Sequence, residues 1–109
     1  MSYPSFQIFK DKSGKFRFRL HSGNTQVVLQ SQGYKTKAAC KVGVNSVKKN
    51  AKVRSRYDVN QAKNGKYFFN LVSGNKEIVG TSQMYSSRDT LRKGIASVMR
   101  NAKAPIEEA

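Results

Sequence analysis

Residues 71–102 read LVSGNKEIVGTSQMYSSRDTLRKGIASVMRNA, and residues 20–51 read LHSGNTQVVLQSQGYKTKAACKVGVNSVKKNA. The two stretches align without a gap, 51 positions apart, and the alignment extends to residues 6–52 and 57–103. Of these 47 aligned pairs 18 are identical. Self-similarity at a fixed period indicates that the fold is built from two copies of one unit.

The first half of each copy has the alternation of a β-strand. Phe16, Phe18 and Leu20 alternate with Arg17 and Arg19, as expected for a strand with one buried face. Three such strands precede the helical pattern in each copy, and the third covers about residues 26–31 and 77–82. In copy 1 the second and third strands are joined by a turn at Ser22-Gly23-Asn24. In copy 2 the first two strands are joined at Asn64-Gly65, where a type I′ turn is expected because Asn and Gly both tolerate positive φ. We therefore expect an antiparallel β-meander.

The last third of each copy has the period of a helix. Apolar residues recur at i, i+4, i+7 and i+11, namely Cys40, Val44, Val47 and Ala51, with Leu91, Ile95, Val98 and Ala102 as their copies. This spacing predicts amphipathic helices near residues 37–49 and 88–100, with Thr36 and Ser87 as N-caps. A glycine inside each helix, Gly43 or Gly94, indicates a close approach between the helix and neighbouring backbone.

Length favours one domain over residues 1–109, because a 47-residue copy alone is near the size where a single core becomes marginal. Copy 1 is assigned to residues 6–52 and copy 2 to residues 57–103. Ala104-Pro105 is expected to end the second helix, and residues 104–109 to form a disordered acidic tail.

Charge is the unusual feature of the composition. The net charge is +15, of which copy 1 carries +10 and copy 2 carries +5. A field of this sign attracts polyanions, although a highly soluble surface with no specific partner is an alternative.

The sequence lacks the residue patterns typical of a secreted protein, a membrane protein, a metalloprotein or an enzyme. The start of the chain has no signal-peptide pattern and no apolar run reaches the length of a membrane span, so a cytoplasmic location is expected. Cys40 is the only cysteine and is expected to be buried, because its copy is Leu91. His21, the only histidine, is expected to be a solvated or packing residue rather than a general base. We assign no catalytic residue, metal site or cofactor, and an enzyme is not expected.

Two candidate surfaces remain. The first is a helix stripe of Lys37, Lys41, Lys48 and Lys52, which the second helix repeats as Arg88, Arg92 and Lys103, with Met99 at the remaining position. It is suited to follow a phosphate backbone, but the alternative is a solvated face whose stems cover apolar surface.

The second candidate is the outer face of the sheet, from which Phe9, Arg17, Arg19, Phe68 and Asn70 are expected to project. Arginines and aromatics on an open sheet suit stacked bases, and they also suit a protein interface. A partly exposed sheet face without a ligand is the third alternative.

Each copy carries G-K-[FY]-x-F-x-L, then S-G-N, then S-Q-x-Y, then G-[VI]-x-S-V-x-x-N-A. This paired motif resembles the YegP-like family, small bacterial proteins with tandem repeats of a domain of unknown function. The resemblance covers about residues 6–103 and implies an α+β fold: tandem β-β-β-α repeats that form a single antiparallel sheet of six strands with pseudo-twofold symmetry. Both helices would lie on one face, exchanged between the halves, and the chain would be a monomer. The family supplies no activity, cofactor or site residues. This chain departs from the pattern in its basic charge, and at Leu29, where copy 2 has Gly80.

These observations favour a small binding module. Nucleic acid is the preferred partner, bound through the lysine-rich helix stripe or through the Arg/Phe sheet face. An acidic protein is the alternative partner, in which case the module would serve protein interaction or structure and its positive charge would be incidental.

Overall fold

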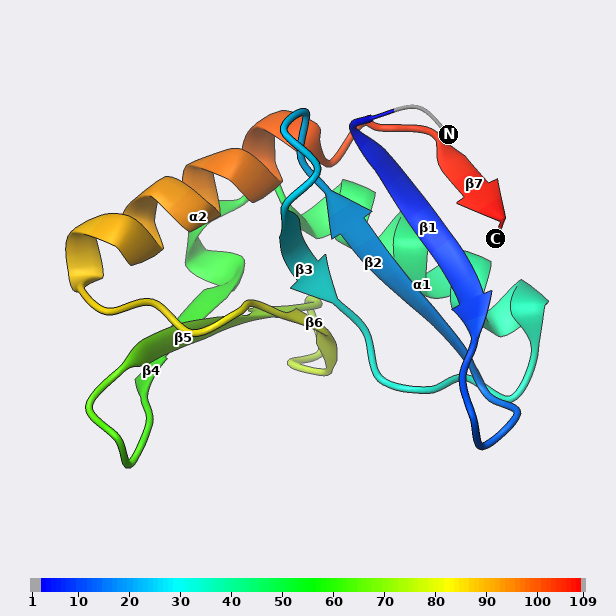
Figure 1. Ribbon diagram of the computed structural model, residues 1–109, viewed down its shortest axis with the longest axis horizontal. Coiled ribbons are helices and arrows are strands. Elements are labelled where there is room, and N and C mark those ends of the chain that lie inside the picture. Colours follow the sequence, from blue (N-terminus) through cyan, green and yellow to red (C-terminus); the bar gives the residue numbers. More distant parts are fainter. Residues whose placement is uncertain (1–2, 109) are drawn as a thin grey trace.

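The computed structural model describes residues 3–108. In each copy a three-stranded meander precedes a helix, as the periodicity predicts (Figure 1). Copy 1 contains β1 (Ser5–Lys10), β2 (Phe16–His21), β3 (Val27–Gln30) and α1 (Lys37–Asn50). A short 3-10 helix, η1 (Arg54–Arg56), leads into copy 2, which contains β4 (Tyr57–Gln61), β5 (Tyr67–Val72), β6 (Ile78–Thr81) and α2 (Arg88–Asn101). A further strand, β7 (Ile106–Glu108), follows α2.

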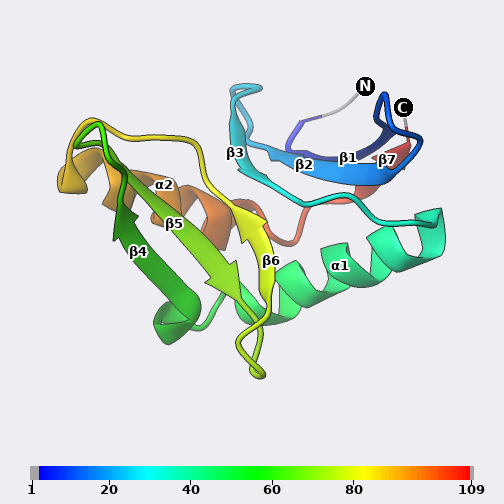
Figure 2. The same cartoon turned by 90° about the horizontal axis from the view of Figure 1, so that it is seen from below.

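The strands form one sheet in the order β4-β5-β6-β3-β2-β1-β7. The inward residues of both halves and the apolar stripes of both helices belong to one core cluster. Each helix also contacts strands of both halves: α1 packs on β2 and β6, and α2 packs on β3 and β5 (Figure 2). The predicted α+β fold, a single sheet with two helices on one face, is therefore confirmed.

The expectation of a strictly antiparallel six-stranded sheet was wrong, and so was the expectation of a disordered tail. β7 is a seventh strand and pairs in parallel with β1, with Ile106 opposite Phe6. The Phe6 N–H donates to Pro105 O at 2.9 Å, and Ile106 packs against the core. So short a segment contains no periodicity that reveals a partner near the other end of the chain. Ala109 lies outside the described residues.

The predicted turns are in place, but their geometry differs from the expectation. In the β4–β5 hairpin the positive φ belongs to Gly65 alone, and Gly65 N–H donates to Ala62 O at 3.0 Å. This is a type I turn followed by one left-handed residue, not a type I′ turn. In the next turn of each copy the left-handed residues are Thr25 and Lys76, each two residues after a glycine.

The helices begin as predicted. Thr36 Oγ1 accepts from Ala39 N–H, and Ser87 forms a capping box with Thr90. The repeated helix glycines, in contrast, approach a side chain and not a backbone. A Cβ on Gly43 would lie 2.7 Å from Tyr34 Cζ, and a Cβ on Gly94 would clash with Tyr85 Oη. Each glycine therefore makes room for the tyrosine ring that precedes its helix.

The two halves of the sheet meet at β3 and β6, which share one register pair, Gln30 with Thr81. Leu29 and Gly80 occupy equivalent positions of the two copies and face each other across this joint. A Cβ on Gly80 would lie only 2.7 Å from Leu29 Cγ, so the leucine fills the space that its own symmetry mate leaves empty. Two leucines cannot both fit there, which explains this departure from the repeat.

Exchanging these two residues tests the joint. We expect Leu29→Gly to lower the free energy of unfolding by about 3–5 kcal/mol, because it removes a fully buried side chain. Gly80→Leu alone adds atoms to a filled space and costs about 1–3 kcal/mol. The double variant should recover at least half of the summed loss, because the leucine then enters from the other strand. Urea denaturation measures all three, and purely additive losses would show that the two positions do not share one space.

Cys40 is fully buried, as its alignment with Leu91 predicts. Burial raises the pKa of its thiol to about 11, which disfavours the reactive thiolate. We expect a thiol reagent at about neutral pH to label the folded protein slowly and the urea-unfolded protein rapidly. Equal labelling rates would contradict the buried position.

Candidate functional site

The predicted helix stripe does not form one continuous surface. The structure divides its seven basic residues among three places: beside the C-terminal tail, at the outer edge of copy 2, and between the ends of the two helices. The division arises because the two helices run through different halves of the molecule and meet only near their C-terminal ends (Figure 2).

At the first place the tail neutralises the stripe. Lys37 Nζ lies 2.6 Å from Glu108 Oε1, and Lys41 Nζ lies 3.3 Å from Glu108 Oε2. Hydrogen bonds from Lys37 and Lys41, together with their charges, lower the pKa of Glu108. Two of the four lysines predicted for the stripe of copy 1 therefore already hold a carboxylate.

At the second place Arg88 and Arg92 are joined by Arg54, which sequence reasoning did not select. With Val59 and Leu91 these arginines line a small hollow of about 130 Å³. Arg54 comes from η1, so its position depends on how the link between the copies folds. No motif in the sequence indicated it.

At the third place Lys48 of α1 meets Lys52 and Lys103, which lie in the turns just after α1 and α2 and not on the helices themselves as predicted. They line a groove of about 430 Å³ with a floor of Ala51, Met99 and Ala102. Within residues 3–108 no carboxylate lies within ion-pair distance of these three lysines. Lys48 Nζ also lies 5.6 Å from the centre of the Phe6 ring, a cation–π contact that orients its stem. We call this place the inter-helix groove.

The outer sheet face is also divided. Phe9 is on β1 and Phe68 is on β5, and the strands β2, β3 and β6 lie between them, so the two rings are too far apart to stack neighbouring bases. The Arg19 guanidinium lies over the Phe9 ring at 4.4 Å, which leaves that ring face covered. Asn70 Oδ1 accepts from the Thr81 hydroxyl at 2.8 Å. The predicted Arg/Phe face is therefore not one stacking platform.

Arg17 is engaged by a carboxylate that the sequence analysis did not pair with it. Its Nε donates to Asp11 Oδ2 at 2.7 Å, and its Nη1 donates to Ser31 O at 3.3 Å. Asp11 Oδ1 accepts from the Ser13 hydroxyl at 2.6 Å. Hydrogen bonds from Ser13 and then Arg17 hold the pKa of Asp11 well below its usual range.

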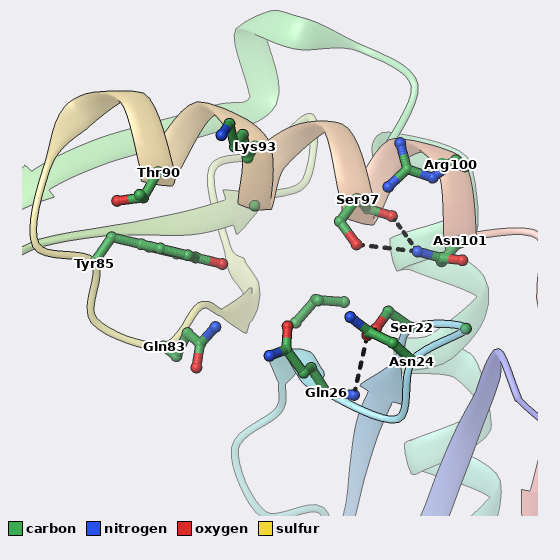
Figure 3. Close-up of a pocket in the computed structure, with 13 residues that line it drawn as sticks. Ser22, Asn24, Gln26, Gln83, Tyr85, Thr90, Lys93, Ser97, Arg100 and Asn101 are labelled. Carbon is green, nitrogen blue, oxygen red and sulfur yellow. Dashed lines mark hydrogen bonds between the residues drawn. The ribbon is translucent and has the colours of Figure 1, made fainter.

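Another hollow, of about 520 Å³, lies between α2 and the β2–β3 turn (Figure 3). Gln83 and Tyr85 stand on one side, and Ser22, Asn24 and Gln26 stand on the other. Lys93 and Arg100 of α2 supply its charge, and no Asp or Glu lines it. Sequence reasoning missed this hollow because its walls come from different copies, and no local pattern connects residues so far apart in the chain.

His21, the only histidine of the chain, contacts the β2–β3 turn and an aromatic ring. His21 Nδ1 lies 3.2 Å from Thr25 O, and its ring meets Tyr3 edge to face at 5.3 Å. Within residues 3–108 no group of three His, Cys, Asp or Glu side chains could hold a metal ion. No helix within the described residues is long and apolar enough to cross a membrane.

The Asp11–Arg17 contact predicts a pH dependence. Because the pKa of Asp11 is depressed in the folded state, its contribution to stability is complete above the unfolded-state pKa of about 3.9. That contribution is lost as the pH falls through the folded-state pKa. We expect Asp11→Asn to lower the free energy of unfolding near pH 7, and the difference from the unsubstituted chain to shrink as the pH falls from about 5 to about 2. Urea titrations across this range measure it, and a difference that does not change with pH would exclude the carboxylate as its cause.

Comparisons with known proteins fit the duplicated fold. The model of a domain of unknown function, DUF1508, matches the chain twice, at residues 11–58 and 62–108. A UPF0339 protein from the ptx operon 5′ region of Stutzerimonas stutzeri is 49% identical over 98 residues, covering 90% of this chain and 88% of that protein. The YegP protein of Escherichia coli K12 is 40% identical over 96 residues, covering 88% of this chain and 87% of that protein.

Solved structures show the same architecture. The solution structure of E. coli YegP, described as a protein of unknown function, has a TM-score of 0.92 at 35% identity and covers 99% of this chain and 94% of its own. The solution structure of UPF0339 protein SO3888 from Shewanella oneidensis has a TM-score of 0.89 at 40% identity and covers 94% of this chain and 88% of its own. Both repeats and nearly the whole fold are thus shared, and the chain belongs to the bacterial DUF1508 family of YegP and its UPF0339 relatives, a family of unknown function.

Proposed function

We propose that this protein binds duplex nucleic acid through the inter-helix groove. The observation that carries the proposal is the meeting of Lys48, Lys52 and Lys103 at the C-terminal ends of the two helices, with no carboxylate in ion-pair distance within residues 3–108. Three uncompensated ammonium groups on one surface attract a phosphate backbone and release its counterions on binding.

The groove favours duplex over single strands. Its floor is formed by Ala51, Met99 and Ala102, so it offers cations for phosphates but no aromatic ring on which a base can stack. The sheet-face route from the sequence analysis has less support, because Arg17 pairs with Asp11 and Arg19 covers the Phe9 ring. Phosphate contacts alone carry no base recognition, so the proposal is for binding without sequence preference.

The test compares two triple variants with equal net charge. The first is Lys48→Gln, Lys52→Gln and Lys103→Gln, which removes the groove charge and keeps much of the apolar stem. The matched control is Lys12→Gln, Lys63→Gln and Lys66→Gln, which removes three exposed lysines from hairpin turns. Fluorescence anisotropy with a duplex of about 20 base pairs measures affinity across a salt series that includes about 0.15 M.

We expect the groove variant to bind at least about tenfold more weakly and to reduce the slope of log affinity against log salt by about 2 to 3. The control should bind within about threefold of the unsubstituted chain, and a single strand of equal length should bind more weakly than the duplex. Equal losses in both variants, or no duplex bound at about 0.15 M salt, would show that the charge is a general surface property.

A further inference from the structure

In copy 1 the fold holds an acidic segment, β7, beside β1. β7 lies parallel to β1, with Ile106 opposite Phe6, Glu107 opposite Gln7 and Glu108 opposite Ile8 (Figure 1). The Glu108 carboxylate lies between Lys37 and Lys41, which are one turn apart on α1. Main-chain pairing along a strand edge and two cations on the neighbouring helix therefore act together on one segment.

The pseudo-twofold relation places an equivalent site at β4. Residues 57–61 correspond to residues 6–10 at the 51-residue offset, and β4 is the terminal strand at the other end of the sheet. Arg88 and Arg92 are the copies of Lys37 and Lys41. Arg54 joins them around the hollow of about 130 Å³ beside Val59. Figure 2 shows β4 at the outer edge of its half, with α2 behind it.

One outward backbone group of β4 is already bonded. Tyr57 N–H donates to Arg54 O of η1, three residues earlier, whereas the equivalent Phe6 N–H of β1 donates to Pro105 O of the tail. Because backbone groups alternate along a strand, Val59 also turns its N–H and C=O away from β5. Within residues 3–108 no strand pairs with this edge, and Val59 remains 39% exposed. An unpaired edge of this kind is a template for another strand.

The cations at this edge have only weak competing partners. Arg92 Nη1 lies 3.4 Å from Asp89 Oδ1, but both side chains are more than two thirds exposed, and such pairs contribute little. Arg54 lies over the Tyr57 ring at 5.9 Å and Arg88 lies over the Tyr67 ring at 5.4 Å. These contacts orient the guanidinium groups without neutralising them. A carboxylate is the ligand for which paired guanidinium groups are suited.

We propose that the β4 edge binds an extended peptide segment of a partner protein by parallel strand addition, with one carboxylate of the segment held between Arg88 and Arg92. The proposal goes beyond nucleic-acid binding and concerns a different surface from the inter-helix groove. Such β-augmentation takes affinity from the main chain and specificity from alternate side chains.

One substitution within the repeat determines which peptide fits. Beside β1 the middle residue of the segment, Glu107, accepts from Gln7 Nε2 at 3.4 Å. The copy of Gln7 is Asp58, which would repel a carboxylate at the middle position. The β4 edge therefore selects an apolar residue, then a basic one, then an acid. This also disfavours the tail of a second copy, in which Glu107 would face Asp58.

The probe is the synthetic peptide acetyl-Pro-Ile-Lys-Glu-Ala-amide, titrated into the full-length ¹⁵N-labelled chain. We expect chemical-shift changes at Val59, Arg88 and Arg92, and slower hydrogen exchange at the Val59 amide. Arg88→Gln with Arg92→Gln should weaken binding at least about tenfold. The matched control, Lys93→Gln with Arg100→Gln, removes equal charge from the same helix and should change binding less than about twofold.

Two further changes test the strand pairing and its selectivity. N-methylation of the peptide lysine amide, which faces β4 in the parallel register, should abolish binding, whereas N-methylation of the glutamate amide, which faces away, should not. Asp58→Gln, which makes β4 resemble β1, should shift the preference from the lysine peptide to its glutamate counterpart, acetyl-Pro-Ile-Glu-Glu-Ala-amide.

Three results would overturn the proposal. Equal losses in the two double variants would indicate non-specific attraction, and equally tight binding of a short oligonucleotide or inorganic phosphate at Arg88 and Arg92 would indicate a general anion site. Protection of Val59 that grows with protein concentration in the absence of peptide would assign the edge to a second copy. The Lys48, Lys52 and Lys103 variant should retain peptide binding, so failure of the nucleic-acid function and failure of this one are distinguishable.

Discussion

The packing of Leu29 over Gly80 is the constraint on which the rest of the structure depends. β3 and β6 share a single register pair, so backbone pairing alone joins the two halves of the sheet only weakly. The leucine fills the position where the repeat would otherwise set two identical side chains against each other. α1 and α2 then bridge the joint, because each packs on strands of both copies. Neither copy has a complete core without the other.

A symmetric scaffold with asymmetric side chains explains where the charge is available. Both copies place two cations one turn apart at the start of the helix, beside an edge strand. At β1 the tail fills that edge and Glu108 neutralises Lys37 and Lys41. At β4 the edge is open within the described residues and three arginines surround it. The same local sequence thus supports a self-contained contact in one half and an open surface in the other.

The positive charge of the chain is not evenly available to a partner. Arg17 is held by Asp11, and Arg19 lies on Phe9, so the sheet face offers less free charge than its sequence suggests. The positive charges of the inter-helix groove and of the β4 edge remain available to a partner. These two surfaces have different chemistry: the groove has ammonium groups above a small apolar floor, and the edge has guanidinium groups beside unpaired backbone. We therefore propose different classes of partner for them, a phosphate backbone for the groove and a peptide that carries a carboxylate for the edge.

The sequence by itself determined the repeat, the three strands and one helix of each copy, both N-caps and the burial of Cys40, because each rests on a local pattern or on alignment between copies. Tertiary structure decided the contacts between elements that are distant in the sequence, which local patterns do not determine. The tail became β7, the basic stripe was split into three places, and Arg54, Lys93 and Arg100 came to line hollows that no motif indicated. The physical reason is that periodicity assigns a residue to a face of its own element, whereas its neighbours on that face are set by long-range packing between elements.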